Sequence, residues 1–135
     1  MEFKDLKIGM FEEVGKTITE ADVVNYAGLS LDINPIHLNN EYAKNSIFKE
    51  RIAHGMLTSG LISAVLGTKL PGEGSIYLSQ TLKFVAPVKI GDTVTAKAEI
   101  IDINSEKRII TLKTTCVNQD KNIVVDGEAK ILKKF

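Results

Sequence analysis

The second half of the chain alternates between apolar and polar residues with a period of two. Four segments show this pattern, at residues 75–85, 93–101, 110–116 and 123–131. Because successive side chains of a strand point to opposite faces, each segment predicts a strand with one buried and one solvated face. Four such strands in succession favour an antiparallel sheet. In the first strand, the expected buried face carries the apolar residues Ile76, Leu78, Leu82 and Phe84.

The beginning of the chain predicts one more strand and a helix. Residues 11–18 are compatible with a further strand, which brings the expected sheet to about five. Thr19, with Asp22 three residues later, resembles a capping box and predicts a helix over Glu20–Leu29. Gly28 is then expected at the end of that helix, because glycine commonly terminates helices.

A single long apolar segment occupies the middle of the chain. Residues 30–53 are polar and predict irregular structure with one short helix near Glu41–Asn45. From His54 to Lys69 no acidic or basic charge interrupts the apolar and small residues. A helix that is apolar almost all round is expected to be buried almost all round. A long antiparallel sheet wrapped around this helix would leave one side open, and we expect a second copy of the chain to cover it.

Composition and charge narrow the class of protein. The 135 residues favour a single domain spanning 1–135, and the 17 Lys and Arg residues are balanced by 17 Asp and Glu residues. With no net charge, there is no basic field to attract nucleic acid or an anionic membrane. The lone cysteine, Cys116, cannot form an intrachain disulfide, and the N-terminus does not resemble a signal peptide. We therefore expect a cytoplasmic protein that binds neither nucleic acid nor membrane.

The stretch SLDINPIH, residues 30–37, combines a turn signature with a histidine. Pro35 disfavours helical geometry at Asn34, so the segment can curve and bring Asp32 and His37 together. A carboxylate and an imidazole that share one water molecule can serve as base and acid near neutral pH. The alternative is an Asx-turn in which Asp32 binds backbone amides and His37 packs nearby. The spacing alone favours the turn.

The stretch AHGM, residues 53–56, opens the predicted buried helix. A helix N-terminus presents free N–H groups, and Gly55 would let a ligand oxygen approach them. Such a donor could stabilise the enolate that develops on a thioester carbonyl. Alternatively, His54 caps the helix and Gly55 only permits close packing, and this structural role is the one favoured by the motif alone.

Other chemistry finds little support in the sequence. No phosphate-binding loop is present, and two histidines and one cysteine far apart do not indicate a metal site. Cys116 alternates with core residues and is expected to be a buried structural thiol.

Three blocks of sequence together resemble one enzyme family. They are YAGLSLDINPIH at 26–37, AHGMLTSGLI at 53–62 and GSIYLSQTLKFVAPVKIGDTV at 74–94. Their order and spacing are similar to those of the MaoC-like (R)-specific enoyl-CoA hydratases, in particular the short single-domain members that feed polyhydroxyalkanoate synthesis. The resemblance covers nearly the whole chain. It implies an α+β hot-dog fold, in which an antiparallel sheet of about five strands wraps a long central helix, with an overhanging segment of the hydratase type.

The resemblance also implies a reaction and a catalytic pair. The reaction is the reversible (R)-specific hydration of a short or medium trans-2-enoyl-CoA to (R)-3-hydroxyacyl-CoA, by a homodimer. No metal or redox cofactor is implied, and coenzyme A is part of the substrate. The catalytic positions match Asp32 and His37, with Asp32 as the base toward water and His37 as the proton donor.

Further site residues follow from the same resemblance. Asn34 matches a supporting position, and the amide of Gly55 matches the donor to the thioester oxygen. Ser63, Leu66 and Ile131 fall where short-chain members line the acyl pocket. One position departs from the family, because Leu31 stands where glycine usually precedes the Asp. If this position needs a positive φ, Leu31 is strained there.

Two other functions compete with hydration. An acyl-CoA thioesterase is possible because the hot-dog fold also hosts such enzymes, but these generally place their carboxylate on the central helix, and residues 54–68 contain no acid. A non-catalytic acyl-CoA-binding module is the second alternative. It would have no need of a water-polarising pair such as Asp32 and His37.

Overall fold

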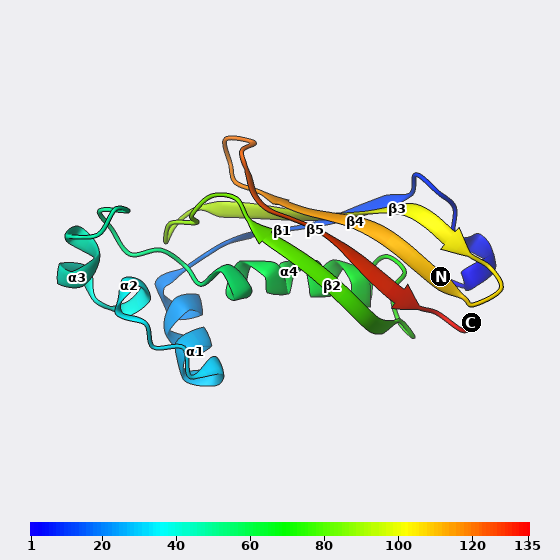
Figure 1. Ribbon diagram of the computed structural model, residues 1–135, viewed down its shortest axis with the longest axis horizontal. Helices are drawn as coiled ribbons and strands as arrows, with labels where there is room; N and C mark the ends of the chain where they lie inside the picture. The colour runs from blue at the N-terminus through cyan, green and yellow to red at the C-terminus, as the bar shows by residue number, and fades with distance from the viewer.

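The computed structural model describes residues 1–135 and consists of one antiparallel sheet curved over one long helix (Figure 1). The helix is α4 (Gly55–Thr68). The strands are β1 (Phe11–Thr17), β2 (Ile76–Phe84), β3 (Thr93–Asn104), β4 (Ile109–Val117) and β5 (Ile123–Leu132). Their spatial order is β1-β3-β4-β5-β2, so β1 and β2 form the two edges. This arrangement confirms the predicted hot-dog fold and its five strands.

The core lies between α4 and the central strands. The alternation predicted for β3 and β4 is confirmed, because their inward residues are fully buried: Val94, Ala96, Ala98, Ile100, Ile110, Leu112, Thr114 and Cys116. The two alanines on β3 leave room for the helix, which packs mainly against this strand. From the helix side, Ile62, Val65 and Leu66 are buried. Each such aliphatic side chain contributes about 1.5–3 kcal/mol when it leaves water.

Two predictions about burial are wrong in a single chain. The helix α4 is exposed along one stripe, formed by Met56, Gly60, Ser63 and Gly67. On β2, none of the residues expected on the buried face is buried, and Ile76, Leu78 and Phe84 are about half exposed. The reason is topological. The strand β2 lies at an edge of the sheet, whereas α4 packs mainly against β3 and β1, so much of the apolar face of β2 has no layer against it.

The segment between β1 and α4 carries three helices that extend beyond one end of the sheet (Figure 1). They are α1 (Glu20–Ser30), α2 (Pro35–Leu38) and α3 (Asn40–Lys44). The predicted capping box of α1 is confirmed, since Thr19 and Asp22 exchange side chain to backbone hydrogen bonds. The short helix predicted near residues 41–45 corresponds to α3, while α2 was not predicted. Both chain termini lie at the opposite end of the molecule, where the Phe3 N–H binds the Phe135 carbonyl (Figure 1).

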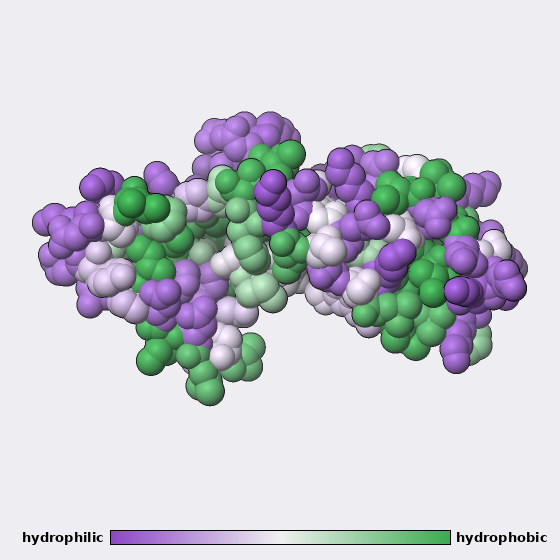
Figure 2. Space-filling view, viewed as in Figure 1, coloured by the Kyte–Doolittle hydropathy of each residue, from purple (hydrophilic) through white to green (hydrophobic).

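One patch of apolar surface lies at the exit of α1. Figure 2 shows apolar atoms at the edge of the molecule formed by this helix, where Leu29, Leu31 and Ile33 are all more than two thirds exposed. None of the helices in the structure has the length and apolar character needed to cross a membrane.

The end of α1 differs from the prediction. Gly28 lies inside the helix, and the C-cap is Leu31, with φ 67° and ψ 12°. This left-handed conformation suits glycine, because a Cβ atom there crowds the backbone. This single left-handed residue ends α1 directly before Asp32. The position where related sequences are expected to have glycine is therefore one that needs a positive φ.

We predict that Leu31→Gly stabilises the protein. The left-handed conformation costs a residue with a Cβ atom roughly 1–2 kcal/mol, and the extra freedom of glycine in the unfolded chain costs about 0.5–1 kcal/mol. The expected gain in the free energy of unfolding is therefore about 0.5–1 kcal/mol, measured by urea denaturation. Leu31→Ala is the matched control, since it removes the exposed side chain but keeps the Cβ. An equal gain in both variants would show that the backbone conformation is not the cause.

Candidate active site

The candidate site is a cavity of about 420 Å³ at the N-terminus of α4. The overhanging segment, residues 18–54 between β1 and α4, provides Asp32 and His37, and α4 provides Gly55 and Thr58. Apolar residues form most of the remaining wall, including Phe48, Phe84, Val88 and Val125. A mostly apolar cavity of this size with a few polar groups at one end is typical of a small-molecule site.

Asp32 enters the cavity through the sharp turn that follows α1. Its carboxylate Oδ1 accepts a hydrogen bond from the Asn34 N–H at 3.2 Å, and its own N–H donates to Ser30 Oγ at 3.1 Å. Asn34 in turn accepts from the Ile36 N–H at 3.2 Å and is the N-cap of α2. The Asx-turn interpretation is therefore correct for the loop. It does not exclude the catalytic one, because Asp32 stays exposed and its second carboxylate oxygen has no partner in the chain.

His37 lies on α2 and is 8% exposed. Its ring Nδ1 is 2.7 Å from the carbonyl oxygen of Ile52. A carbonyl can only accept, so Nδ1 carries the proton, and the neutral ring presents a lone pair at Nε2. Burial lowers the pKa of His37 below its ordinary value of 6.5, and His54 adds to this effect, while the Ile52 carbonyl and Asp32 oppose it.

His54 lies directly beneath His37. The two rings are stacked, with centroids 3.8 Å apart and planes inclined at 27°. His54 precedes α4 but makes no side-chain cap to the helix. Instead, its Nε2 donates to the backbone carbonyl of Asp32 at 2.9 Å, and its Nδ1 is buried without a partner. His54 therefore supports both members of the Asp32–His37 pair, through a hydrogen bond to one and through stacking on the other.

Gly55 is the first residue of α4, so its N–H has no intrahelical acceptor and lies where the helix dipole is positive. The Phe84 ring packs directly against it. A Cβ atom built on Gly55 would lie 2.6 Å from two ring carbons of Phe84. A side chain at this position would have to displace the Phe84 ring, and Gly55 itself lines the cavity.

One cluster of potential metal ligands coincides with this site. Candidate ligand atoms of Asp32, His37 and His54 lie within 4.8 Å of one another. An imidazole binds a metal through a lone pair in the plane of its ring. Because the two rings are stacked, their lone pairs run side by side and do not converge on one point.

Comparison with known proteins identifies the family. Residues 8–122 match the family model of the MaoC-like domain. The chain belongs to the MaoC-like family. It is 52% identical to an (R)-specific enoyl-CoA hydratase of Rhodospirillum rubrum, over 96% of this chain and 90% of that protein. It is 50% identical to a 3-hydroxybutyryl-CoA dehydratase of Methylorubrum extorquens, over 96% of this chain and 82% of that protein.

A solved structure gives the same result. The (R)-hydratase from Aeromonas caviae involved in polyhydroxyalkanoate biosynthesis superposes with a TM-score of 0.94 at 41% identity, covering 96% of this chain and 98% of that one. The resemblance that the sequence motifs indicated is thereby confirmed, as are the fold and the class of reaction, a hydro-lyase.

The MaoC-like site contains some of the predicted residues and not others. Asp32, His37 and Gly55 line one cavity, and Asn34 supports its loop. Ser63 lines a second cavity farther along α4. Leu66 and Ile131 are 1% exposed and belong to the hydrophobic core. In a single chain, these last two side chains reach neither cavity.

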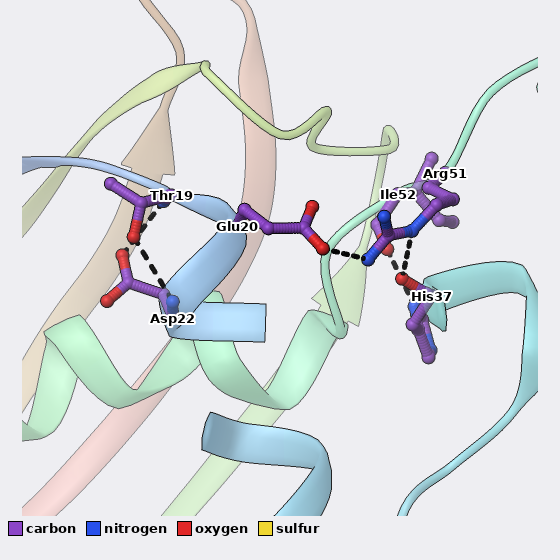
Figure 3. Close-up of polar contacts among 6 residues, drawn as sticks. All are labelled: Thr19, Glu20, Asp22, His37, Arg51 and Ile52. Carbon is purple, nitrogen blue, oxygen red and sulfur yellow. Dashed lines mark hydrogen bonds and ion pairs between the residues drawn. The ribbon is translucent and has the colours of Figure 1, made fainter. Parts of the chain in front are cut away.

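Three residues in or next to this MaoC-like site make contacts that were not predicted from the sequence. Phe84 was assigned to a buried sheet face, and it lies over Gly55 instead. His54 was considered as a helix cap, and its ring bonds to Asp32. Arg51 gave no signal, although its Nε donates to the backbone carbonyl of His37 at 2.7 Å (Figure 3). The only available hint was its position three residues before His54.

We predict that His37 titrates below pH 6.5 and that its neutral form carries the proton on Nδ1. ¹⁵N-detected NMR on the imidazole rings measures both properties, and His37→Gln assigns the signals because the chain has only two histidines. Because the pKa of His37 is lower in the folded protein, the unfolded chain binds this proton at a higher pH than the folded protein does. The free energy of unfolding should therefore decrease from about pH 6.5 down to the pKa of the folded protein, and His37→Gln should weaken this dependence. A neutral ring protonated on Nε2 would contradict the hydrogen bond to Ile52.

Proposed function

We propose that this protein catalyses the reversible (R)-specific hydration of short or medium trans-2-enoyl-CoA thioesters, and that Asp32 and His37 activate the water. The observation that carries the proposal is the approach of Asp32 and His37 to the free N-terminus of α4 within one cavity. A hydratase needs two things at once: a held water molecule and a donor to the thioester oxygen. The functions named for the close relatives agree with this reaction.

The geometry supports a simple sequence of events. The thioester oxygen accepts a hydrogen bond from the Gly55 N–H while water lies between the Asp32 carboxylate and His37 Nε2. The water oxygen bonds to C3, the electron pair of the double bond moves toward the thioester oxygen, and one proton leaves the water. C2 then takes up one proton as the carbonyl re-forms.

The position of the proton on the His37 ring limits how His37 can act as a proton donor. Asp32 is proposed as the base toward water and His37 as the donor to C2. Because the neutral ring has its proton on Nδ1, Nε2 starts without one. We infer that the proton that Asp32 takes from water passes to Nε2 of His37 and from there to C2. Both groups then return to their starting state, so the pair acts as one unit. The same steps in reverse dehydrate a 3-hydroxyacyl-CoA.

The proposal gives the remaining predicted residues a location. The exposed stripe of α4 connects the cavity at Gly55 to the second cavity at Ser63, because Met56 lines both. An acyl chain that begins at Gly55 would follow this stripe. Ser63 would then contact its far end, with Leu66 and Ile131 behind it as the core that limits its length.

The thioesterase alternative has less support. Asp32 is the one carboxylate that lines the cavity, and α4 carries none. The binding-module alternative differs only in lacking turnover. The site needs no metal or redox cofactor for this chemistry, and a cytoplasmic location stays a prediction.

We predict that crotonyl-CoA loses its enoyl absorbance without release of free thiol when the protein is added. Asp32→Asn should lower turnover by about 10²–10⁴-fold, as expected for the loss of an acid–base group, while circular dichroism is unchanged. Asp102→Asn, an exposed change on β3 far from the cavity, is the matched control. Thiol release would indicate a thioesterase, and no reaction would leave a binding module. An (R)-specific dehydrogenase coupled to the assay tests the stereochemistry.

We also propose that the protein is a homodimer formed through β2. The two edges of the sheet differ in character. The strand β1 carries Glu12, Glu13 and Lys16, which discourage edge-to-edge pairing, whereas β2 has Lys83 as its only charge. Figure 2 shows apolar surface over both ends of β2, with polar atoms between them. A second copy related by a two-fold axis would pair the unpaired backbone of β2 and cover the open stripe of α4.

Leu78→Lys should shift the protein from dimer to monomer. Leu78 is 48% exposed at the β-bulge of β2, and a lysine there would bring two like charges together across a two-fold axis. Phe11→Lys makes the same kind of change at a 52% exposed residue of β1 and should leave the dimer intact. Sedimentation velocity at several concentrations gives the mass. A monomeric wild-type protein, or dissociation by the β1 variant, would contradict the proposal.

A further inference from the structure

Arg51 joins two parts of the overhanging segment that are far apart in sequence (Figure 3). Its Nε donates to the backbone carbonyl of His37 at 2.7 Å, and its Nη2 donates to Glu20 Oε1 at 2.8 Å. The side chain of Arg51 is 11% exposed, unlike that of Glu20, which is 58% exposed. A nearly buried guanidinium with two directed hydrogen bonds is a fixed structural element, in contrast to a mobile surface charge.

The helix that carries His37 depends on such outside contacts. With four residues, α2 is too short to be stable by itself. The last carbonyl groups of α2 accept no hydrogen bond from within the helix, because the helix ends at Asn39. The Nε–H of Arg51 supplies a donor for the carbonyl of His37. Without it, that carbonyl would be partly buried and unpaired, which destabilises the local backbone.

Two consecutive residues, Arg51 and Ile52, bind the backbone and the ring of His37. Arg51 binds its backbone carbonyl, and the carbonyl of Ile52 accepts the proton of ring Nδ1. The Ile52 N–H also donates to the Ile36 carbonyl at 3.3 Å. Because the backbone and the ring are both fixed to one short segment, the direction of Nε2 depends on where Arg51 and Ile52 lie relative to α2.

Glu20 fixes the other end of the arginine. It is the first residue of α1, and α1 is anchored by the capping box of Thr19 and by its buried residues Val23 and Ala27. The guanidinium therefore spans from a well-anchored helix start to the backbone of His37. A planar fork of donors can reach both partners at once, and a lysine ammonium in the same place could not keep both geometries.

We propose that Arg51, held by Glu20, is a positioning residue that fixes His37 Nε2 toward the water of the reaction. This inference rests on the proposed hydratase function. Arg51 does not line the cavity and touches no reacting atom. Its effect should therefore fall on kcat and leave the KM for crotonyl-CoA close to that of the wild type.

Arg51→Ala should lower kcat by about 10–100-fold, by analogy with the removal of an outer-shell partner that orients a metal-bound histidine. Arg51→Lys should lie between this variant and the wild type. Added guanidinium ion should restore part of the kcat of Arg51→Ala and none of that of Asp32→Asn. Glu20→Gln, which keeps an acceptor oxygen but no charge, should lose less activity than Glu20→Ala. The control is Lys16→Gln, which removes the ion pair of 3.0 Å with Asp22 in the same first turn of α1 and should leave kcat unchanged.

The ¹⁵N spectrum of His37 provides a readout that does not depend on activity. In the wild type, Nδ1 carries the proton; in Arg51→Ala, the ring should exchange between tautomers as its contact with Ile52 loosens. Wild-type kcat in Arg51→Ala, a loss confined to KM, or an unchanged tautomer would overturn the proposal. If Arg51→Ala does not fold, Arg51→Lys and Glu20→Ala decide by the same criteria. If the wild-type protein hydrates no enoyl-CoA, the proposed function fails, and the tautomer still tests the role of Arg51.

Discussion

The hydrogen bond from the His54 ring to the backbone carbonyl of Asp32 joins the two halves of the candidate site. His54 stands at the start of the buried helix, which the sheet holds in place. Asp32 lies on an exposed loop that follows a left-handed residue. This contact is the direct hydrogen bond between the residue that precedes α4 and the residue that carries the carboxylate. The same ring stacks on His37, so one buried side chain contacts both members of the proposed acid–base pair.

A short segment, residues 51–54, connects the sheet to the loop that carries Asp32 and His37. The Ala53 N–H binds the Val88 carbonyl at 2.7 Å, and Ile52 forms a β-bridge with Lys89. These contacts fix residues 51–54, which in turn bind the loop at Asp32 and His37. These contacts explain how a four-residue helix can hold His37, the proposed catalytic histidine, in a fixed position. Local propensity contributes little to α2, and tertiary contacts define it.

Prediction from the sequence succeeded where a pattern has one structural cause. The alternation in β3 and β4, the capping box at Thr19 and the charge-free run of α4 each correspond to a single local geometry. It failed where the cause is topological. The apolar residues of β2 have the same alternation as those of β3, and only the strand order shows that β2 is an edge. Likewise, nothing local distinguishes Arg51 from a surface arginine, because its partners lie 14 and 31 residues away.

The exposed stripe on α4 and the edge strand β2 relate the site to the proposed dimer. Met56 lines the cavity of Asp32 and His37 and also the second cavity, whose other walls belong to β2 and α4. A partner seated on β2 would therefore help to close the second cavity, whereas Asp32 and His37 come from the segment between β1 and α4. The polar chemistry would then belong to one chain, whereas the depth available to the acyl group would depend on the pairing of two. On this view, the length of the acyl group and the hydration step are governed by separate parts of the structure.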